Sequence, residues 1–310
     1  MSLRKRKHAN AGIDLVDTDR YPIRDLSTRQ AKKLIAACRK QLKLDGSLLL
    51  EGFIRKEHIE EMKREVSGLE SFQRLEILEV LRADQSMDKT IYDQPLPDDH
   101  PVFFKMPQNV HAVANDVIPT NSMLRSVYNS QEVMDFIAAV NGKRKIYQFA
   151  DEFQALNVMY MKDGGSRAWH YDGSDFVVTL MLQPSESGGE FEYAPFIRGK
   201  NPDDENFQNI KRLFDGDWPT KITRCNAGAL AVFNGRRSLH RVRNVFGKNM
   251  RIMSVLSYAK SRGETGKPEK NVMLYGERVK RIYEKRGIRL QVDGAGKLVV
   301  NHNSLLKSKL

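Results

Sequence analysis

The second half of the chain carries a series of short apolar runs, each followed by a turn rich in glycine, serine or asparagine, and this pattern limits the fold more than any other feature. The series begins near Ile146 and ends near Lys260. It includes FQALNVMYMK, FVVTLMLQ, EFEYAPF, GALAVFN, LHRVRNV and MRIMSVLSYA, with turns at DGGSR, PSESGG, GRRS and FGKN. Closely spaced strands separated by tight turns predict an antiparallel sandwich or barrel. We therefore expect a mainly β core over residues 146–260.

The rest of the chain divides around this core. Residues 1–20 read as a flexible basic tail, and residues 21–145 as a helical region interrupted by an irregular loop over about 84–122. Within that region the pattern predicts helices over about 27–46, 55–70 and 130–143, the first with an N-cap at Ser27, and a short strand over 47–54. Residues 261–310 are expected to form a linker, a helix and a weakly structured tail.

Composition is that of an ordinary globular protein, with 40% hydrophobic and 29% charged residues in 310. The two cysteines, Cys38 and Cys225, lie far apart, which favours a reducing compartment over a disulfide. No apolar run approaches the roughly 20 residues of a membrane helix. We expect a cytoplasmic protein that does not span a membrane, although the basic N-terminus leaves a nuclear location open. The sequence does not indicate an oligomeric state.

The formal charge of +12 raises the question of a polyanionic partner. The basic residues are scattered, and the chain has no RNP, zinc-finger or helix-turn-helix pattern. Solvated helix faces and tails are the simpler interpretation. Nucleic acid stays open as a partner, but no motif supports it.

One short segment, AWHYDGSDFVVTLMLQ, places His170 and Asp172 two positions apart at the start of an apolar run. Alternate residues of a strand project to the same face. A histidine and a carboxylate there supply two corners of a 2-His-1-carboxylate triad, which leaves three positions open on a six-coordinate Fe(II). His240, in NGRRSLHRVRNV, is the candidate for the third ligand. The other five histidines lie in tails, on a helix or in the irregular segment: His8, His58, His100, His111 and His302.

Arg251 opens the apolar run RIMSVLSY, eleven residues after His240. A tight turn at FGKN would place it on the strand next to His240. An arginine that begins an almost entirely apolar strand is expected to point into the barrel, where it needs an anionic partner. Its planar guanidinium is suited to a bidentate grip on a carboxylate.

HYD, His240 and Arg251 in this β context resemble the Fe(II)/2-oxoglutarate-dependent dioxygenase superfamily. The segment DGSLLLEGFI is similar to its usual N-terminal approach to the core. The resemblance implies a double-stranded β-helix, or jelly roll, with flanking N- and C-terminal helices. It also implies that His170, Asp172 and His240 bind iron and that Arg251 binds the distal carboxylate of 2-oxoglutarate. Dioxygen would be the second cosubstrate, and ascorbate can support activity in such enzymes.

Within the superfamily, LPDDHPVF, WHYDGSDFVVTLMLQ and SGGEFEY are similar to a group that hydroxylates or halogenates free amino acids, including lysine. Radical halogenases of that group carry a small residue in place of the carboxylate ligand. Asp172 stands there in this chain, so the resemblance favours the hydroxylase branch. The expected reaction is hydroxylation of an unactivated C–H bond of a small polar substrate, with a free amino acid as one candidate.

Further candidates follow from strand alternation. Asn157 and Thr179 are expected to help bind 2-oxoglutarate, although backbone groups could satisfy either side chain. Trp169 should face away from the histidine and the aspartate. Glu152 could bind a substrate amine, and Tyr275 could belong to a C-terminal lid.

Two other functions stay open at this point. One is a hydroxylase or demethylase of a protein side chain or of nucleic acid, which the basic charge keeps in view. The other is a cupin-like protein that binds metal without oxygen chemistry, although cupin sites usually draw on more histidines than this core contains.

Overall fold

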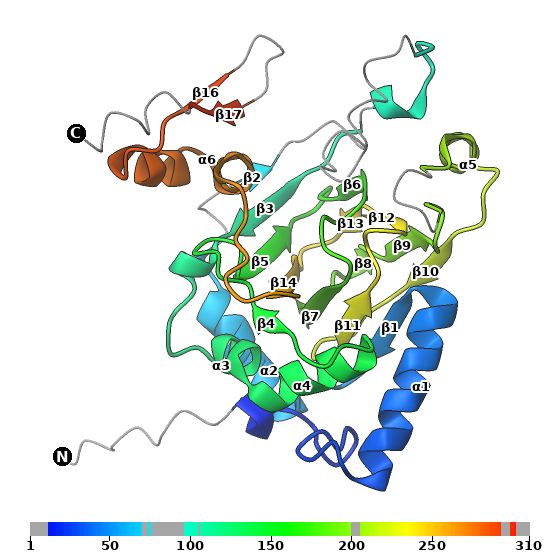
Figure 1. Cartoon of the computed structure of the whole chain (residues 1–310), viewed down its shortest axis with the longest axis vertical. Helices are drawn as coiled ribbons and strands as arrows, with labels where there is room; N and C mark the ends of the chain where they lie inside the picture. Colours follow the sequence, from blue (N-terminus) through cyan, green and yellow to red (C-terminus); the bar gives the residue numbers. More distant parts are fainter. Residues whose placement is uncertain are drawn as a thin grey trace.

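Two antiparallel sheets form the centre of the computed structural model, which describes residues 12–69, 74–75, 96–104, 106–199, 205–292 and 298–301 (Figure 1). The larger sheet has the strand order β1-β11-β7-β14-β5-β3-β2. Its strands are β1 (Ser47–Leu50), β2 (Arg74–Leu75), β3 (Val110–Val113), β5 (Leu156–Met161), β7 (Val177–Gln183), β11 (Leu230–Phe233) and β14 (Arg251–Leu256). The smaller sheet, β10-β9-β12-β6, comprises β6 (Arg167–His170), β9 (Phe191–Ala194), β10 (Lys221–Thr223) and β12 (Leu239–Val242).

Three further strand pairs lie outside these sheets: β4 (Tyr147–Gln148) with β15 (Tyr258–Ala259), β8 (Ser187–Gly188) with β13 (Val245–Phe246), and β16 (Leu290–Val292) with β17 (Leu298–Val300). Every pairing between described strands is antiparallel. The mainly β, antiparallel core predicted from the sequence is therefore confirmed.

The helices surround this core. They are α1 (Arg29–Asp45), α2 (Lys56–Val66), α3 (Met123–Asn129), α4 (Gln131–Val140), α5 (Phe207–Phe214) and α6 (Pro268–Lys285), with short 3-10 helices η1 (Gly12–Leu15), η4 (Pro101–Phe103) and η5 (Asn115–Val117). The N-cap of α1 is Thr28 rather than the predicted Ser27: the Thr28 side chain accepts from the Ala31 N–H, while the Ser27 N–H is held by Asp25. The ends of α1 at Gly46 and of α4 at Asn141 agree with the sequence.

The two faces of the larger sheet have different roles. Ile252 and Leu256 on β14 belong to the apolar core that also contains Ile35 of α1, Met62 of α2 and Phe136 of α4. Helices thus cover this face, as Figure 1 shows for α1, α2 and α4. Because side chains alternate along a strand, Arg251, Met253 and Val255 project to the opposite face.

That opposite face packs against the smaller sheet. The ring of Phe233, at the end of β11, lies 4.8 Å from Phe191 and 5.4 Å from Tyr193 of β9, measured between centroids. It also lies 4.7 Å from the ring of His240 on β12. The two sheets therefore meet face to face, with aromatic side chains from both sheets between them.

The structure corrects the predicted boundaries at both ends. Residues 12–20 are not a free tail, because Ile13, Leu15 and Val16 are buried in the main core; residues 1–11 lie outside the described part. β1 and β3, from the predicted N-terminal region, join the larger sheet, so the core extends beyond residues 146–260. The C-terminal segment contains the β16–β17 pair instead of only a tail.

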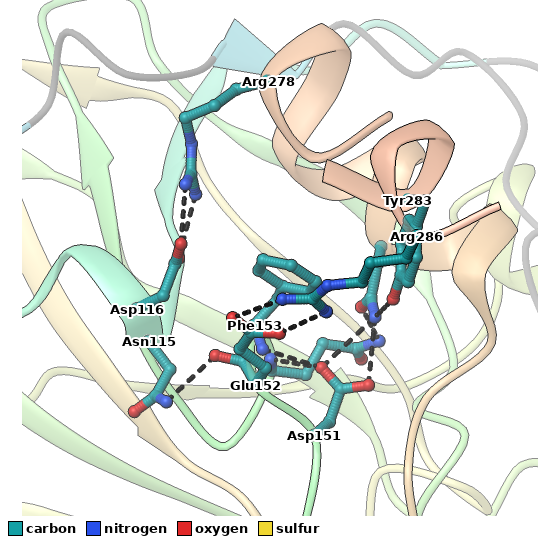
Figure 2. Close-up of polar contacts among 10 residues, drawn as sticks. Asn115, Asp116, Asp151, Glu152, Phe153, Arg278, Tyr283 and Arg286 are labelled. Carbon is teal, nitrogen blue, oxygen red and sulfur yellow. Dashed lines mark hydrogen bonds and ion pairs between the residues drawn. The ribbon is translucent and has the colours of Figure 1, made fainter. Parts of the chain in front are cut away.

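A polar network fastens α6 to the loop that precedes β5 (Figure 2). Asp151, which is 5% exposed, accepts hydrogen bonds from the backbone N–H groups of Phe153, Gln154 and Gly266 and from the side chain of Asn271. At the exposed edge, Arg286 pairs with Glu152, while Arg278 pairs with Asp116. These contacts hold α6 against the β core.

The cysteines and the helices agree with two expectations from the sequence. Cys38 and Cys225 are both free thiols, as predicted. In the part of the chain that the structure describes, no helix has the length and apolarity to cross a membrane.

Candidate metal centre

His170, Asp172 and His240 come together between the two sheets. His170 is the last residue of β6 and lies directly opposite His240 on β12. One ligand atom from each of the three residues falls within 4.8 Å of the others. The His240 Nε2 lies 3.3 Å from Asp172 Oδ2, and the His170 Nε2 lies 3.9 Å from Asp172 Oδ1. The sequence-predicted grouping of these residues is therefore present.

Backbone carbonyls orient both imidazoles. The Nδ1 of His170 lies 2.8 Å from the Ala168 oxygen, and the Nδ1 of His240 lies 3.0 Å from the Ser238 oxygen. A carbonyl oxygen only accepts, so each Nδ1 carries the proton and each Nε2 keeps its lone pair. Metal-ligating histidines characteristically donate their other ring N–H to such a partner.

Both imidazoles are also held in their neutral form. Burial lowers the pKa of His170 well below its usual range, and the nearby His240 and Arg167 lower it further. Burial likewise lowers the pKa of His240, with the Asp172 carboxylate opposing the shift. A neutral imidazole with a free Nε2 can coordinate a metal at neutral pH without first losing a proton.

Asp172 lies beyond the end of β6, so strand alternation does not account for its position. Its N–H donates to the carbonyl of Gly235 at 3.1 Å. A Cβ placed on Gly235 would lie 1.6 Å from Asp172 Oδ2. The absence of a side chain at Gly235 thus makes room for the carboxylate, a role that sequence reasoning missed in the NGRR turn.

Tyr171, between the histidine and the aspartate, anchors this loop in a separate cluster of buried residues. The guanidinium carbon of Arg198 lies 3.8 Å from the centre of its ring. Arg198 is itself in a buried ion pair with Glu205 at 2.8 Å, and it donates to the Arg236 carbonyl. The ion pair and the ring contact hold Tyr171 in place, and with it the backbone that carries His170 and Asp172 on either side.

Arg167 is a second residue that sequence reasoning missed. On β12, His240 and Val242 are two positions apart, but their partners on β6, His170 and Arg167, are three positions apart. This bulge shifts the alternation, so Arg167 and His170 share a face. The Arg167 Nε donates to the His170 Nε2 at 3.4 Å.

Trp169 occupies the other side of β6, as predicted. It is buried in the same cluster as Tyr171, and the Arg241 guanidinium lies 4.8 Å from the centre of its ring. Arg241 and Arg243 both pair with Glu192, at 2.8 Å. These two arginines are therefore already engaged with a carboxylate.

Arg251 is a buried cation, 3% exposed, on the inner face of β14. Its Nε donates to the Gly189 carbonyl at 3.1 Å, while Nη1 and Nη2 have only the Met253 sulfur, each at 3.7 Å. No carboxylate in the described part of the chain pairs with it. The prediction that it lies on the strand next to His240 is wrong: β14 lies between β7 and β5 in the larger sheet, whereas His240 is in the smaller one.

Asn157 and Thr179 lie in one row of the larger sheet, because Val255 of β14 is opposite both. This row is on the inner face of the sheet, the face that also carries Arg251. Asn157 is 6% exposed, and its Oδ1 has no hydrogen-bond partner in the described structure. Thr179 is half-buried. Both side chains are thus available to a bound molecule. The need for a partner is greater for Asn157, because its buried oxygen has no hydrogen bond in the described structure.

Tyr275 extends from α6 toward the same region. Its hydroxyl is buried and without a hydrogen-bond partner in the described part of the chain. Burial, with the charges of Asp151 and Asp116, raises its pKa, and the nearby Asn157 side chain weakly opposes the shift. The backbone bends directly after it at Gly276, where φ is 72° inside α6.

Glu152 is excluded from this site, contrary to the expectation that it could bind a substrate amine. Both of its carboxylate oxygens are bonded to the guanidinium of Arg286, at 2.7 and 3.1 Å (Figure 2). The pair lies at the surface where α6 meets the loop before β5, with side chains 49% and 45% exposed.

A family model described as "HalD: Halogenase D" matches residues 101–274, which include all three triad residues and Arg251. No curated protein sequence matches the chain. Among solved structures it is similar to the non-heme α-ketoglutarate-dependent epimerase SnoN from nogalamycin biosynthesis, with 12% identity, a TM-score of 0.50 and coverage of 74% of this chain and 81% of that one.

Two further structures are similar at lower TM-scores. A 2OG-Fe(II) oxygenase family oxidoreductase from Burkholderia pseudomallei has 16% identity, a TM-score of 0.46 and coverage of 74% of this chain and 92% of that one. AviO1 from Streptomyces viridochromogenes Tue57 has 15% identity, a TM-score of 0.49 and coverage of 74% and 96%. At such identities the likeness concerns the fold alone.

Proposed function

The chain belongs to the halogenase D family, and on that basis we propose that it is an Fe(II)/2-oxoglutarate-dependent dioxygenase. We propose further that it hydroxylates an unactivated C–H bond of a small polar substrate, with a free amino acid as the first candidate. The observation that carries the proposal is the grouping of His170, Asp172 and His240. The two packed sheets are consistent with the double-stranded β-helix fold of such enzymes.

The donor set fits iron. Two neutral imidazole nitrogens and one carboxylate oxygen are the ligands of the 2-His-1-carboxylate class of non-heme Fe(II) sites. Their Nε2 atoms face the carboxylate because both Nδ1 atoms donate to backbone carbonyls. Bound iron, with 2-oxoglutarate and dioxygen, would supply an oxidant that removes hydrogen from the substrate, while the oxoacid becomes succinate and carbon dioxide.

Arg251 is proposed to hold the distal carboxylate of 2-oxoglutarate. A buried guanidinium with two nitrogens on only a sulfur acceptor lacks adequate compensation for its charge, and a carboxylate would accept from both. The hydrogen bond from its Nε to the Gly189 carbonyl fixes the direction in which Nη1 and Nη2 point. Asn157 and Thr179 are proposed to contact the same molecule from the neighbouring strands, with the Tyr275 hydroxyl as a further buried donor.

Asp172 favours hydroxylation over halogenation. The Asp172 carboxylate would take one ligand position of a bound metal and bring one negative charge, so that the position a halide needs would already be filled. Gly235 supports this choice, because the carboxylate fills the space beside it. The family's description as a halogenase therefore need not extend to the reaction of this chain.

A screen of free L-amino acids tests the proposal. The purified protein would be loaded with Fe(II) under nitrogen, supplied with 2-oxoglutarate, ascorbate and chloride, and assayed for succinate release on admission of oxygen. We expect one amino acid or a small group to stimulate succinate release, and the product to gain one oxygen atom from labelled dioxygen. A chlorinated main product would contradict the hydroxylase assignment, and failure to consume 2-oxoglutarate with any amino acid or alone would contradict the dioxygenase assignment.

A further inference from the structure

We propose that Arg167 binds a carboxylate of the substrate beside the metal centre, so that the substrate is an organic acid. This inference rests on the proposed function and adds the residue that would recognise the substrate and the group it would bind. It comes from the bulge in β6, which places a guanidinium on the face that carries His170 and His240.

The Arg167 side chain is partly buried, and its enclosed end lacks an acceptor among the described residues. Its Nη1 is enclosed and has no hydrogen-bond partner among the described residues. Its Nε donates to the His170 Nε2 at 3.4 Å, a long bond to a neutral ring. No carboxylate of the described chain forms an ion pair with it. An enclosed N–H of a guanidinium is costly unless an acceptor, and best an anion, compensates it.

Metal binding would remove the acceptor that the Arg167 Nε now has. The lone pair on the His170 Nε2 that now accepts from Arg167 is the same one that a metal would take. Once a metal is bound, the Arg167 Nε and Nη1 would both be without an acceptor. A carboxylate that accepts from Nη1 can take a second, parallel hydrogen bond from Nη2 at the end of the guanidinium.

Charge balance favours the substrate as the source of this carboxylate. Fe(II) and the Asp172 carboxylate leave one positive charge, and the two carboxylates of 2-oxoglutarate turn this into one negative charge. Arg251 brings the balance to zero. The positive charge of Arg167 is then left without a balancing charge among these groups.

The 1-carboxylate of 2-oxoglutarate is the other possible source, and the experiment separates the two. Protein loaded with Co(II), a paramagnetic metal for which we expect no turnover, and saturated with 2-oxoglutarate would be titrated with trifluoroacetate. Fluorine-19 relaxation reports whether the anion binds close to the metal. Trifluoroethanol, which has no charge, serves as the matched probe. The variants are Arg167→Gln and Arg167→Lys, and Arg241→Gln is the control because Arg241 pairs with Glu192.

We expect saturable relaxation of trifluoroacetate but not of trifluoroethanol in the wild type. Arg167→Gln should weaken trifluoroacetate binding by at least about tenfold, since a charged hydrogen-bond partner is lost. Arg167→Lys should retain part of the binding, and Arg241→Gln all of it. The affinity for 2-oxoglutarate, measured by calorimetry, should be unchanged in Arg167→Gln.

Three results would overturn the inference: no saturable binding of trifluoroacetate near Co(II) in the wild type, equal binding by Arg167→Gln, or a loss in Arg167→Gln of 2-oxoglutarate binding instead. The last would assign the carboxylate to the cosubstrate. If the wild type binds neither Co(II) nor 2-oxoglutarate, the proposed function fails. A fluorine chemical-shift titration of the metal-free wild type and Arg167→Gln then decides separately whether Arg167 binds anions.

Discussion

The Asp172 carboxylate fills the space that a side chain at Gly235 would occupy. The Asp172 N–H donates to the Gly235 carbonyl, and a Cβ on Gly235 would lie 1.6 Å from Asp172 Oδ2 and 2.5 Å from its Cγ. Either the Asp172 carboxylate or the turn at Gly235 would have to move to relieve such an overlap. The turn before β12 therefore determines where the acidic member of the triad can lie.

Gly235→Ala should disable the metal centre without changing any ligand. We expect metal affinity to fall by about 10- to 100-fold, the usual range when the surroundings of a ligand are disturbed. Calorimetric titration with Co(II) would measure it. Gly173→Ala is the matched control, because the nearest atom to its added Cβ is the Lys270 Nζ at an ordinary 3.7 Å. Equal affinities in the two variants would show that the Asp172 carboxylate is not a ligand.

Two members of the triad, His170 and Asp172, could be predicted together because they are two positions apart in the sequence. Two ligand types two positions apart, followed by a histidine in a late strand, narrow the choice to a few residues. The expectation that strand alternation places His170 and Asp172 on one face was only partly right. Asp172 follows the end of β6, and its position depends on Gly235. A contact between residues 63 positions apart in the chain cannot be deduced from either segment alone.

Arg167 and Arg251 show where a single sequence stops being informative. A bulge changes which residues share a face, and nothing in DGGSRAWH indicates the extra residue in β6. Arg251 was correctly expected to be buried, because an apolar strand follows it. The predicted neighbouring strand of Arg251 was wrong. After β12 the chain crosses from the smaller sheet to the larger one, so β12 and β14 do not form a hairpin.

Removing one imidazole should abolish metal binding. His240→Ala or His170→Ala leaves two of the three ligands, and we expect at least about a 100-fold loss of Fe(II) affinity together with loss of 2-oxoglutarate consumption. Binding would be measured under nitrogen by calorimetry. His58→Ala, in α2 and not part of the triad, should behave like the wild type. Turnover at the wild-type rate by either triad variant would remove that histidine from the site.

Arg251→Gln should weaken 2-oxoglutarate binding while sparing the metal. Loss of one partner of a buried charge pair costs roughly 2–5 kcal/mol, or about 30-fold to several thousand-fold in affinity. The dissociation constants of both Co(II) and 2-oxoglutarate would be measured on the same preparation. Arg243→Gln, whose wild-type side chain pairs with Glu192, is the control. An unchanged 2-oxoglutarate affinity would mean that another cation binds the distal carboxylate.

The docking of α6 should depend on Asp151 far more than on the neighbouring surface pair. Asp151→Ala leaves buried N–H donors of Phe153, Gln154 and Asn271 without their acceptor, so we expect the free energy of unfolding to fall by about 2–4 kcal/mol. Arg286→Ala breaks a pair whose side chains are 49% and 45% exposed, and should cost less than about 1 kcal/mol. Urea unfolding measures both, and equal losses would contradict the buried network as the anchor.

The metal-free protein should lose stability as the pH falls from about 7 toward 5. Histidines of the unfolded chain titrate near pH 6.5, whereas burial lowers the pKa of both His170 and His240 in the folded state. Below pH 6.5 the unfolded chain therefore binds protons that the folded protein does not, and each such proton lowers the free energy of unfolding by up to about 1.4 kcal/mol per pH unit.

Comparison with a variant isolates this contribution. A His170→Gln/His240→Gln protein lacks both titrating groups, so its free energy of unfolding should depend less steeply on pH between 7 and 5, while the two proteins should have parallel profiles above pH 7.5. Urea titrations at half-unit intervals of pH, in the presence of a chelator, would give both curves. Parallel curves throughout would mean that the two imidazoles protonate as readily in the folded protein as in the unfolded chain. The buried, neutral pair on which metal binding at neutral pH depends would then not exist.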